Sequence, residues 1–338
     1  MNPRSFIQAV VLIFAFLVLA VYALILLVDP YGNVAFSLPL DRAPISTNQR
    51  FAFPSIARDH QYDSVVIGSS TMRLLNPERL DPLLGARFAN LAMNSATAYE
   101  QMRVHALFSL HHAKTKYVIV GIDDSWCKRE QAYEKFTFRE FPEWMFDENQ
   151  WNDLLYLFND KALENTVRLL ELVGGRREPK YEKSGYRDFT VDFGNYDRVW
   201  VEKRLYPRGK SPATGPGQLA PSSLQPKWQF ATHPLLESML ALEASLPKNT
   251  ILVFAPIHAA YLARTETLYR ECKDRIVKIG RTHGVRIIDF MIESDITKRD
   301  DNYWDPLHYR SEVARIIETD IANELNESKS RSTRYVTY

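Results

Sequence analysis

An almost unbroken apolar segment, residues 6–28, constrains the fold of this chain more than any other feature. Only Gln8 interrupts it. At about 1.5 Å of rise per residue, a helix of this length crosses the hydrocarbon core of a bilayer. A cleaved signal peptide would have a shorter apolar region followed by a small-x-small cleavage site, whereas this segment runs directly into Asp29 and Pro30. The sequence therefore predicts an uncleaved transmembrane anchor.

The charges that flank this segment indicate its orientation. Arg4 and the amino terminus precede it, and Asp29 follows it. The excess of positive charge on cytoplasmic segments favours a cytoplasmic N-terminus with the remaining chain outside. We therefore expect a single-pass protein of the inner (cytoplasmic) membrane whose main domain is periplasmic or otherwise extracytoplasmic.

Composition excludes some functions. The chain has 42 Lys and Arg residues and 41 Asp and Glu residues. It therefore lacks the large positive net charge that would favour nucleic acid as a partner. The two cysteines, Cys127 and Cys272, lack the spacing of a zinc site, and we expect both to be buried apolar residues. The sequence predicts neither a metal nor a cofactor.

Strands and helices alternate along most of the chain. Five short apolar runs rich in β-branched residues are predicted strands, at residues 64–67, 88–93, 117–120, 250–255 and 285–290. Helical spacing occurs at residues 76–84, 99–112, 235–246, 265–281 and 311–325. This alternation predicts an α/β domain at residues 61–325, with a parallel sheet covered on both faces.

Three further segments complete the predicted organisation. Residues 29–60 are rich in Pro, Asn and Arg and are predicted to be an irregular linker. Residues 126–228 are less periodic and form a predicted insertion, with one or two helices at 152–173 and an exposed loop at 207–226. Residues 326–338 are predicted to be a polar tail.

Polar residues follow every predicted strand. Ligands of open parallel sheets bind at the carboxyl ends of the strands, so these residues are candidate site residues. In chain order they are Ser70, Asn94 and Ser95, Asp123, His258, and the pair Asp305 and His308.

The spacing Asp305-x-x-His308 suggests how Ser70 could be activated. A histidine can take the proton of a serine hydroxyl, and a carboxylate can fix the imidazole tautomer. Alone, Gly68-Ser69-Ser70 is more typical of a helix N-cap, and a DxxH pair in a surface loop is common by chance. The combination favours a catalytic triad of Ser70, Asp305 and His308.

Together, "VVIGSSTMR" and "WDPLHY" resemble the SGNH/GDSL hydrolase superfamily. The form "GSS" after an N-terminal anchor is similar to its membrane-anchored branch, which includes alginate O-acetylation and teichoic-acid D-alanylation proteins. The resemblance implies a flavodoxin-like three-layer fold and an acyl-serine intermediate. It also implies an acylated polysaccharide or other cell-envelope polymer as substrate, and a multi-spanning acyltransferase as membrane partner.

The oxyanion site departs from the superfamily pattern. Its usual glycine is replaced by Ser95, whose backbone N–H can still serve together with that of Ser70. The usual asparagine is replaced by Asp123, a carboxylate that would repel a developing oxyanion, so we expect Asn94 to supply the third donor. Asp123 and His258 are candidate substrate contacts, although a neighbour could equally satisfy His258.

Two functions remain open from the sequence. The first is a serine-dependent esterase or O-acyltransferase that acts on an extracytoplasmic polymer. The second is a non-catalytic, membrane-anchored assembly factor that keeps the same fold, which Asp123 favours and the Ser–Asp–His combination opposes.

Overall fold

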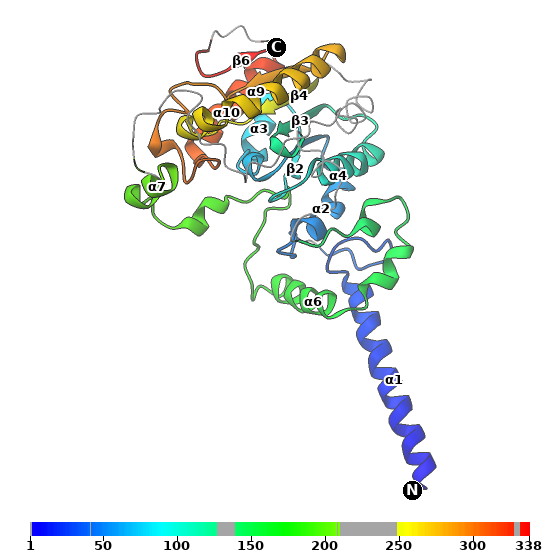
Figure 1. Ribbon diagram of the computed structural model, residues 1–338. Helices are drawn as coiled ribbons and strands as arrows, with labels where there is room; N and C mark the ends of the chain where they lie inside the picture. The colour runs from blue at the N-terminus through cyan, green and yellow to red at the C-terminus, as the bar shows by residue number, and fades with distance from the viewer. Residues whose placement is uncertain (1, 41, 127–138, 208, 210–248, 328–331) are drawn as a thin grey trace. The chain divides into compact units, whose positions relative to one another are not determined.

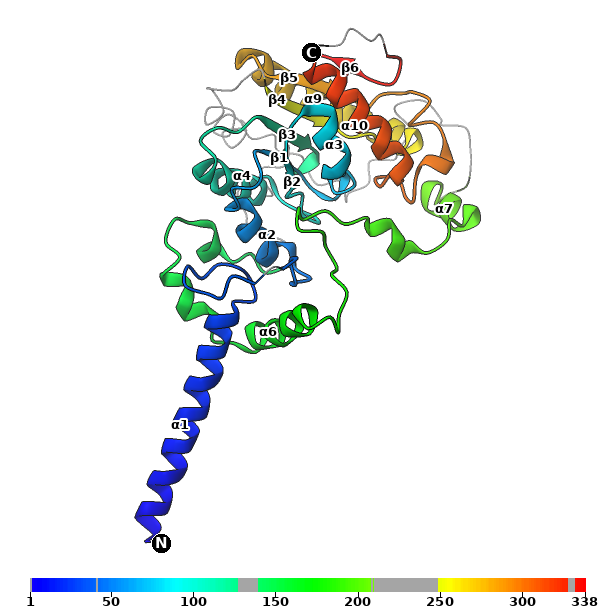
Figure 2. The ribbon, with the colours of Figure 1, turned by 180° about the vertical axis from the view of Figure 1, so that it is seen from behind.

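The computed structural model describes residues 2–40, 42–126, 139–207, 209, 249–327 and 332–338 (Figure 1, Figure 2). It divides into two compact units. Unit 1 comprises Met1–Ile56 and Pro142–Gly185, and unit 2 comprises Ala57–Phe141 and Tyr186–Tyr338. The predicted helix at residues 235–246 and the loop at 207–226 lie almost entirely outside the described residues.

Unit 1 begins with the long helix α1 (Pro3–Val28). The Asn2 side chain accepts a hydrogen bond from the Arg4 N–H, and Pro3 occupies the first helical position, where no amide hydrogen is needed. The helix is long and apolar enough to cross a membrane, and most of its side chains are exposed. Burial begins only in its last turns, at Ile25 and Val28.

The rest of unit 1 is folded around the end of α1. It contains α2 (Gln49–Ala57), η3 (Glu143–Phe146), η4 (Asn152–Leu157) and α6 (Asp160–Val173). Residues 29–60 were predicted to be an irregular linker, but they include α2 and several fully buried polar side chains. Asp29 accepts the Val34 N–H at 2.7 Å, and Asn33 hydrogen-bonds Asp153. Buried polar contacts of this kind do not produce a periodic pattern of apolar residues in the sequence, so they could not be predicted from it.

Unit 2 contains one six-stranded sheet in the order β2-β1-β3-β4-β5-β6. The first five strands pair in parallel, as predicted. The strands are β1 (Ser64–Ile67), β2 (Phe88–Asn90), β3 (Tyr117–Ile122), β4 (Thr250–Phe254), β5 (Arg286–Asp289) and β6 (Val336–Thr337).

Strand β6 pairs antiparallel with β5, and it lies in the segment predicted to be a polar tail. Its two residues are exposed and are paired with β5 through the backbone, while the preceding residue, Tyr335, is buried against Phe290. An exposed edge strand of this length gives no hydrophobic pattern in the sequence. The sheet is therefore mixed, although its central strands are all parallel.

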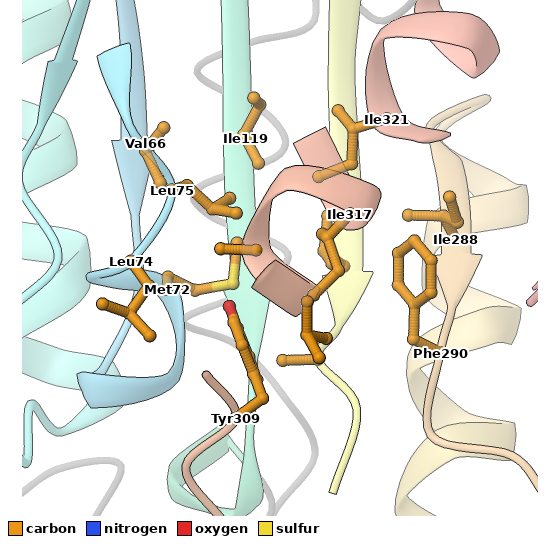
Figure 3. Packing of buried hydrophobic residues seen from close by; sticks show 14 of the residues in the cluster. Val66, Met72, Leu74, Leu75, Ile119, Ile288, Phe290, Tyr309, Ile317 and Ile321 are labelled. Atoms are coloured by element: carbon orange, nitrogen blue, oxygen red, sulfur yellow. The ribbon is translucent and has the colours of Figure 1, made fainter. Parts of the chain in front are cut away.

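Helices cover both faces of the sheet, as predicted. On one face, α3 (Pro77–Leu84) and α10 (Ser311–Leu325) contact each other, and Figure 3 shows Ile317 and Ile321 of α10 packed over Ile119 and Ile288. Residues alternate between the two faces of a strand. Leu252 and Ile287 therefore face the other side, where they pack against Gly280 of α9 (Ala259–Thr282). The helix α4 (Ala98–His111), which begins with a capping box, packs against β1.

A buried ion pair joins α10 to the start of α3. Glu318 is 1% exposed, accepts the Asn76 N–H at 2.6 Å, and hydrogen-bonds the Arg79 guanidinium at 2.8 Å. Removing one partner of such a pair leaves the others desolvated without compensation.

We predict that Glu318→Ala lowers the free energy of unfolding by about 3 kcal/mol, because Asn76 and Arg79 lose their acceptor. The matched control is Glu312→Ala on the same helix, where an exposed carboxylate pairs with Arg310. The control should change stability by less than about 0.5 kcal/mol. Urea unfolding of the detergent-solubilised chain measures both values, and equal losses would contradict the prediction.

Candidate active site

The candidate site lies at the carboxyl edge of the sheet in unit 2. Ser70 begins η1 (Ser70–Met72), the turn that directly follows β1. Asp305 and His308 lie in the loop between η7 (Asp300–Asn302) and α10. The structure brings these three residues together although Ser70 and His308 are 238 positions apart in the chain.

The geometry is that of a serine–histidine–aspartate triad. The Ser70 Oγ lies 2.8 Å from His308 Nε2, and His308 Nδ1 lies 2.8 Å from Asp305 Oδ2. With the ring proton on Nδ1, His308 donates to Asp305 and its Nε2 accepts the Ser70 hydroxyl proton. Asp305 and His308 are 20% and 24% exposed, so the pair is shielded from water yet open to a substrate.

Asp305 is held in its ionised form by its own loop. Burial works to raise the pKa of this carboxyl, but the His308 ring and the backbone N–H groups of Leu307 and His308 together lower it below its ordinary value. The two N–H groups lie 2.9 Å and 3.0 Å from Oδ1. Asp305 is therefore both charged and fixed in orientation, as a partner of a catalytic imidazole must be.

Further hydrogen bonds position the histidine loop against the serine turn. The Tyr309 hydroxyl donates to the Thr71 carbonyl, and in Figure 3 this hydroxyl is directed toward the turn that carries Met72. The Trp304 N–H donates to the His308 carbonyl at 2.8 Å. Since Thr71 and Tyr309 are the immediate neighbours of Ser70 and His308, their contact helps to hold the Ser70 hydroxyl beside the His308 ring.

The serine turn fits closely onto the ends of β1 and β3 because of two glycines. A Cβ atom at Gly68 would lie 2.4 Å from Met72 Cγ, and one at Gly121 would lie 2.0 Å from the same atom. Met72 is fully buried. The φ of Gly68 is not in the left-handed region, so the space that this glycine leaves for Met72 explains it better than backbone conformation does.

The two adjacent serines are placed differently. Ser69 is buried, and its side chain hydrogen-bonds the Asp123 carboxylate. Ser70 is half-buried and hydrogen-bonds His308. Ser70 is therefore the better candidate nucleophile, because the Ser69 hydroxyl is already engaged at the end of the neighbouring strand.

Asp123 is the most perturbed acid in the site. Burial raises its pKa to about 6, the charge of Asp124 adds to the effect, and hydrogen bonds from Ser125 and Ser69 oppose it. The Ser125 N–H lies 2.9 Å from Asp123 Oδ1. Near neutral pH this group is mostly ionised, which places a negative charge next to the serine turn.

The loop after β2 carries the other candidate oxyanion donors. The Met93 N–H donates to the Gly68 carbonyl at 3.0 Å, which attaches this loop to the serine turn. Asn94 is half-buried, and Ser95 is exposed with a φ of +52°. A non-glycine residue in this region costs roughly 1–2 kcal/mol, and strain of this kind concentrates at functional sites. The positive φ of Ser95 also explains why a glycine would suit position 95. Within the part of the chain that the structure describes, no group accepts the Ser70 N–H.

His258 has the surroundings of the second alternative drawn from the sequence, a histidine whose hydrogen bonds are satisfied by its neighbours. It is 1% exposed; its Nε2 donates to Asp300 at 3.1 Å and its Nδ1 accepts the Ala260 N–H at 3.2 Å. Its backbone N–H donates to the Pro306 carbonyl at 2.9 Å. The Nδ1 atom thus caps α9, and the Nε2 atom binds Asp300 in η7, next to the loop that carries Asp305.

Two residues that were not predicted from the sequence pack beside the triad. The Phe189 ring, in η5 (Phe189–Phe193), meets the His308 ring edge to face with centroids 5.9 Å apart. The Arg73 guanidinium lies over the Phe189 ring, 4.6 Å from its centroid. Phe189 lies in the region predicted to be an insertion, where no periodic pattern distinguishes a site residue from a core residue. Arg73 directly follows η1 and belongs to the serine turn.

No known protein-family model matches this chain, and no curated protein has a significantly similar sequence. The function of the site is therefore argued from its residues and their geometry.

Asp123 should make stability depend on pH. Because its pKa is higher in the folded chain than in the unfolded chain, folding takes up a proton between about pH 4 and pH 6. The contribution is fully present below the unfolded pKa and is lost as the pH rises through about 6. We predict that Asp123→Asn gains stability relative to the unaltered chain, on the order of 2 kcal/mol, between pH 4 and pH 7.

Urea unfolding at several pH values measures this difference. The exposed carboxylate of Asp192 provides the control, and Asp192→Asn should show no comparable change over the same range. A stability difference for Asp123→Asn that does not vary with pH would contradict the raised pKa.

Proposed function

We propose that this chain is a membrane-anchored, serine-dependent esterase or O-acyltransferase of the SGNH type. The observation that carries the proposal is the unbroken hydrogen-bonded chain from Ser70 through His308 to Asp305, with both contacts at 2.8 Å. Support also comes from the strand order β2-β1-β3-β4-β5, which is the doubly wound order with ligands at the carboxyl edge.

The proposed reaction proceeds in two steps. The Ser70 Oγ attacks the carbonyl carbon of an ester as His308 Nε2 takes the hydroxyl proton, and Asp305 stabilises the resulting imidazolium. The tetrahedral intermediate collapses, the C–O bond to the leaving alcohol breaks, and His308 returns the proton to that alcohol. Acyl-Ser70 is then attacked by water or by another hydroxyl, which His308 deprotonates, and the Ser70 hydroxyl is restored. Water as the second nucleophile gives hydrolysis, and a sugar hydroxyl gives acyl transfer.

The oxyanion donors in this proposal are the N–H groups of Ser70 and Ser95 and the side-chain amide of Asn94. Each lies in the serine turn or in the loop bonded to it through Gly68 and Met93. Removing one such donor typically costs 2.7–4 kcal/mol of activation free energy. Asp123 stands close to this region as a negative charge, which makes a slow enzyme, or one that works best below neutral pH, the expected consequence.

An extracytoplasmic location is part of the proposal. A signal peptide is removed, whereas the end of α1 is integrated into unit 1, since Ile25, Val28 and Asp29 are buried there. Cys272 is buried but disulfide-bonded, so the expectation of a free thiol is wrong for this residue. Cys127 lies outside the described residues. Disulfides persist mainly in oxidising compartments, which favours placing unit 2 outside the cytoplasm.

The proposed substrate is an acylated polysaccharide or another cell-envelope polymer, as the resemblance to the membrane-anchored SGNH branch implies. For a transferase, a multi-spanning membrane protein would supply the acyl group. Hydrolysis and transfer use the same acyl-serine intermediate. The triad can therefore be tested without knowing which reaction occurs or which acyl group is carried.

We predict that Ser70→Ala and His308→Ala each lower kcat/KM for a small acetyl ester by on the order of 10⁴-fold or more. Asp305→Asn should cost a similar factor, since it favours the wrong imidazole tautomer. Ser69→Ala is the matched control: it removes the adjacent hydroxyl, which bonds Asp123, and should keep most of the activity.

Hydrolysis of a chromogenic acetyl ester by the detergent-solubilised chain measures these rates, with circular dichroism to establish that each variant is folded. Loss of activity in Ser69→Ala but not in Ser70→Ala would contradict the assignment of the nucleophile. A background rate in the unaltered chain and in all four variants would leave the non-catalytic assembly factor as the better account.

A further inference from the structure

We propose that unit 1 docks onto the lipid surface through exposed apolar side chains on the segments that contact or adjoin the end of α1. We call this set of side chains the collar. Its main members are Phe36, Leu38, Trp151, Leu155, Phe158 and Val167. The proposal rests on the proposed membrane anchoring by α1 and is independent of the ester chemistry at Ser70.

The collar contains several large apolar side chains that are exposed. Leu155 is 81% exposed, Trp151 is 67% exposed and Phe158 is 55% exposed. Single exposed apolar residues need no explanation, but a group of large ones marks a surface that contacts something other than water. The collar is therefore a binding surface, and the remaining question is what covers it.

Direct contacts connect the collar to the last turns of α1. The Tyr22 hydroxyl donates to the Leu154 carbonyl at 2.6 Å, and the Tyr22 ring meets Phe158 edge to face at 5.3 Å between centroids. On the other segment, the Leu38 N–H donates to the Leu27 carbonyl at 2.8 Å. These contacts join the apolar helix α1 to two of the segments that carry the collar.

The position of these contacts along α1 matches the edge of a bilayer. About 20 residues of helix span a hydrocarbon core roughly 30 Å thick. Counted from Pro3, the start of α1, a span of that length ends at Tyr22, the residue that contacts the collar. Tyr and Trp are enriched at the level of the lipid headgroups. Tyr22 and Trp151 are therefore the residue types expected at this depth.

Helix α6 has the pattern of an interfacial helix. Leu163, Val167 and Leu170 recur at i, i+4 and i+7 and are all exposed, so they form one apolar stripe. The helix packs against α1, and Figure 1 and Figure 2 both show it running crosswise beside the end of α1. A helix that crosses a membrane-spanning helix in this way lies along the bilayer plane, where an apolar stripe can enter the headgroup boundary.

Charged residues of α6 lie beside the stripe. Arg168 pairs with Glu164 at 2.5 Å, and both residues are partly exposed. An interfacial helix keeps such groups in the hydrated layer while its apolar side chains enter the lipid. This combination of anchor, aromatic side chains and amphipathic helix favours a lipid surface over a second protein as the occupant of the collar.

Tryptophan fluorescence in nanodiscs that contain brominated phosphatidylcholine tests the proposal with the full-length chain. Bromine quenches tryptophan only at contact range, so quenching relative to unbrominated lipid reports lipid contact. Trp151→Phe should remove roughly half or more of the lipid-dependent quenching, because Trp151 is the interfacial tryptophan. Trp200→Phe is the matched control, since Trp200 is also exposed but lies in α7 (Arg198–Leu205) of unit 2.

A second variant keeps the test independent of any change caused by removing Trp151. Leu155→Trp, made together with Trp151→Phe, should restore the quenching. The proposal is overturned if Trp151→Phe keeps the full quenching, or if the tryptophan at position 155 is not quenched, while the chain stays in the nanodisc after an alkaline wash. Release of the chain by that wash would instead overturn the anchoring proposal and the docking with it.

Discussion

The parallel pairing of the first five strands is the constraint on which the rest of unit 2 depends. Parallel strands end at one edge, so the residues that follow them meet there whatever their separation in the chain. The pairing of β1 with β3, and of β3 with β4 and β4 with β5, fixes the order in which these ends lie. Ser70 and His308 reach hydrogen-bonding distance for this reason, and the Tyr309 contact with Thr71 then limits their movement.

The parts of the fold with strong periodic patterns could be predicted from sequence. The strand Ser64–Ile67 and the helix Ser311–Leu325 have the predicted bounds, because both are bounded by turn residues and bury apolar side chains at regular spacing. The parts that were not predicted are held in place by contacts that produce no periodic sequence pattern. They include β6, held by backbone pairing, and the linker, held by the buried polar groups of Asp29 and Asn33.

The same distinction applies to the site. Ser70, Asp305 and His308 could be predicted to meet because residue type and strand order together specify their positions. His258 could not be assigned, since a histidine after a strand has the same appearance in sequence whether it contacts a substrate or caps a helix. Phe189 was not predicted, because its contact with His308 depends on how a non-periodic segment returns to the sheet edge. Burial and hydrogen bonds, which only the structure provides, decide both cases.

The most direct test of the catalytic assignment is the site at which a fluorophosphonate reacts with the full-length chain. The reagent phosphonylates a serine only where a neighbouring base activates its hydroxyl, with release of fluoride. Tandem mass spectrometry can distinguish Ser69 from Ser70 on the same peptide. The account predicts one adduct on Ser70 that is absent from the His308→Ala variant. An unmodified Ser70, or an adduct that persists without His308, would contradict it.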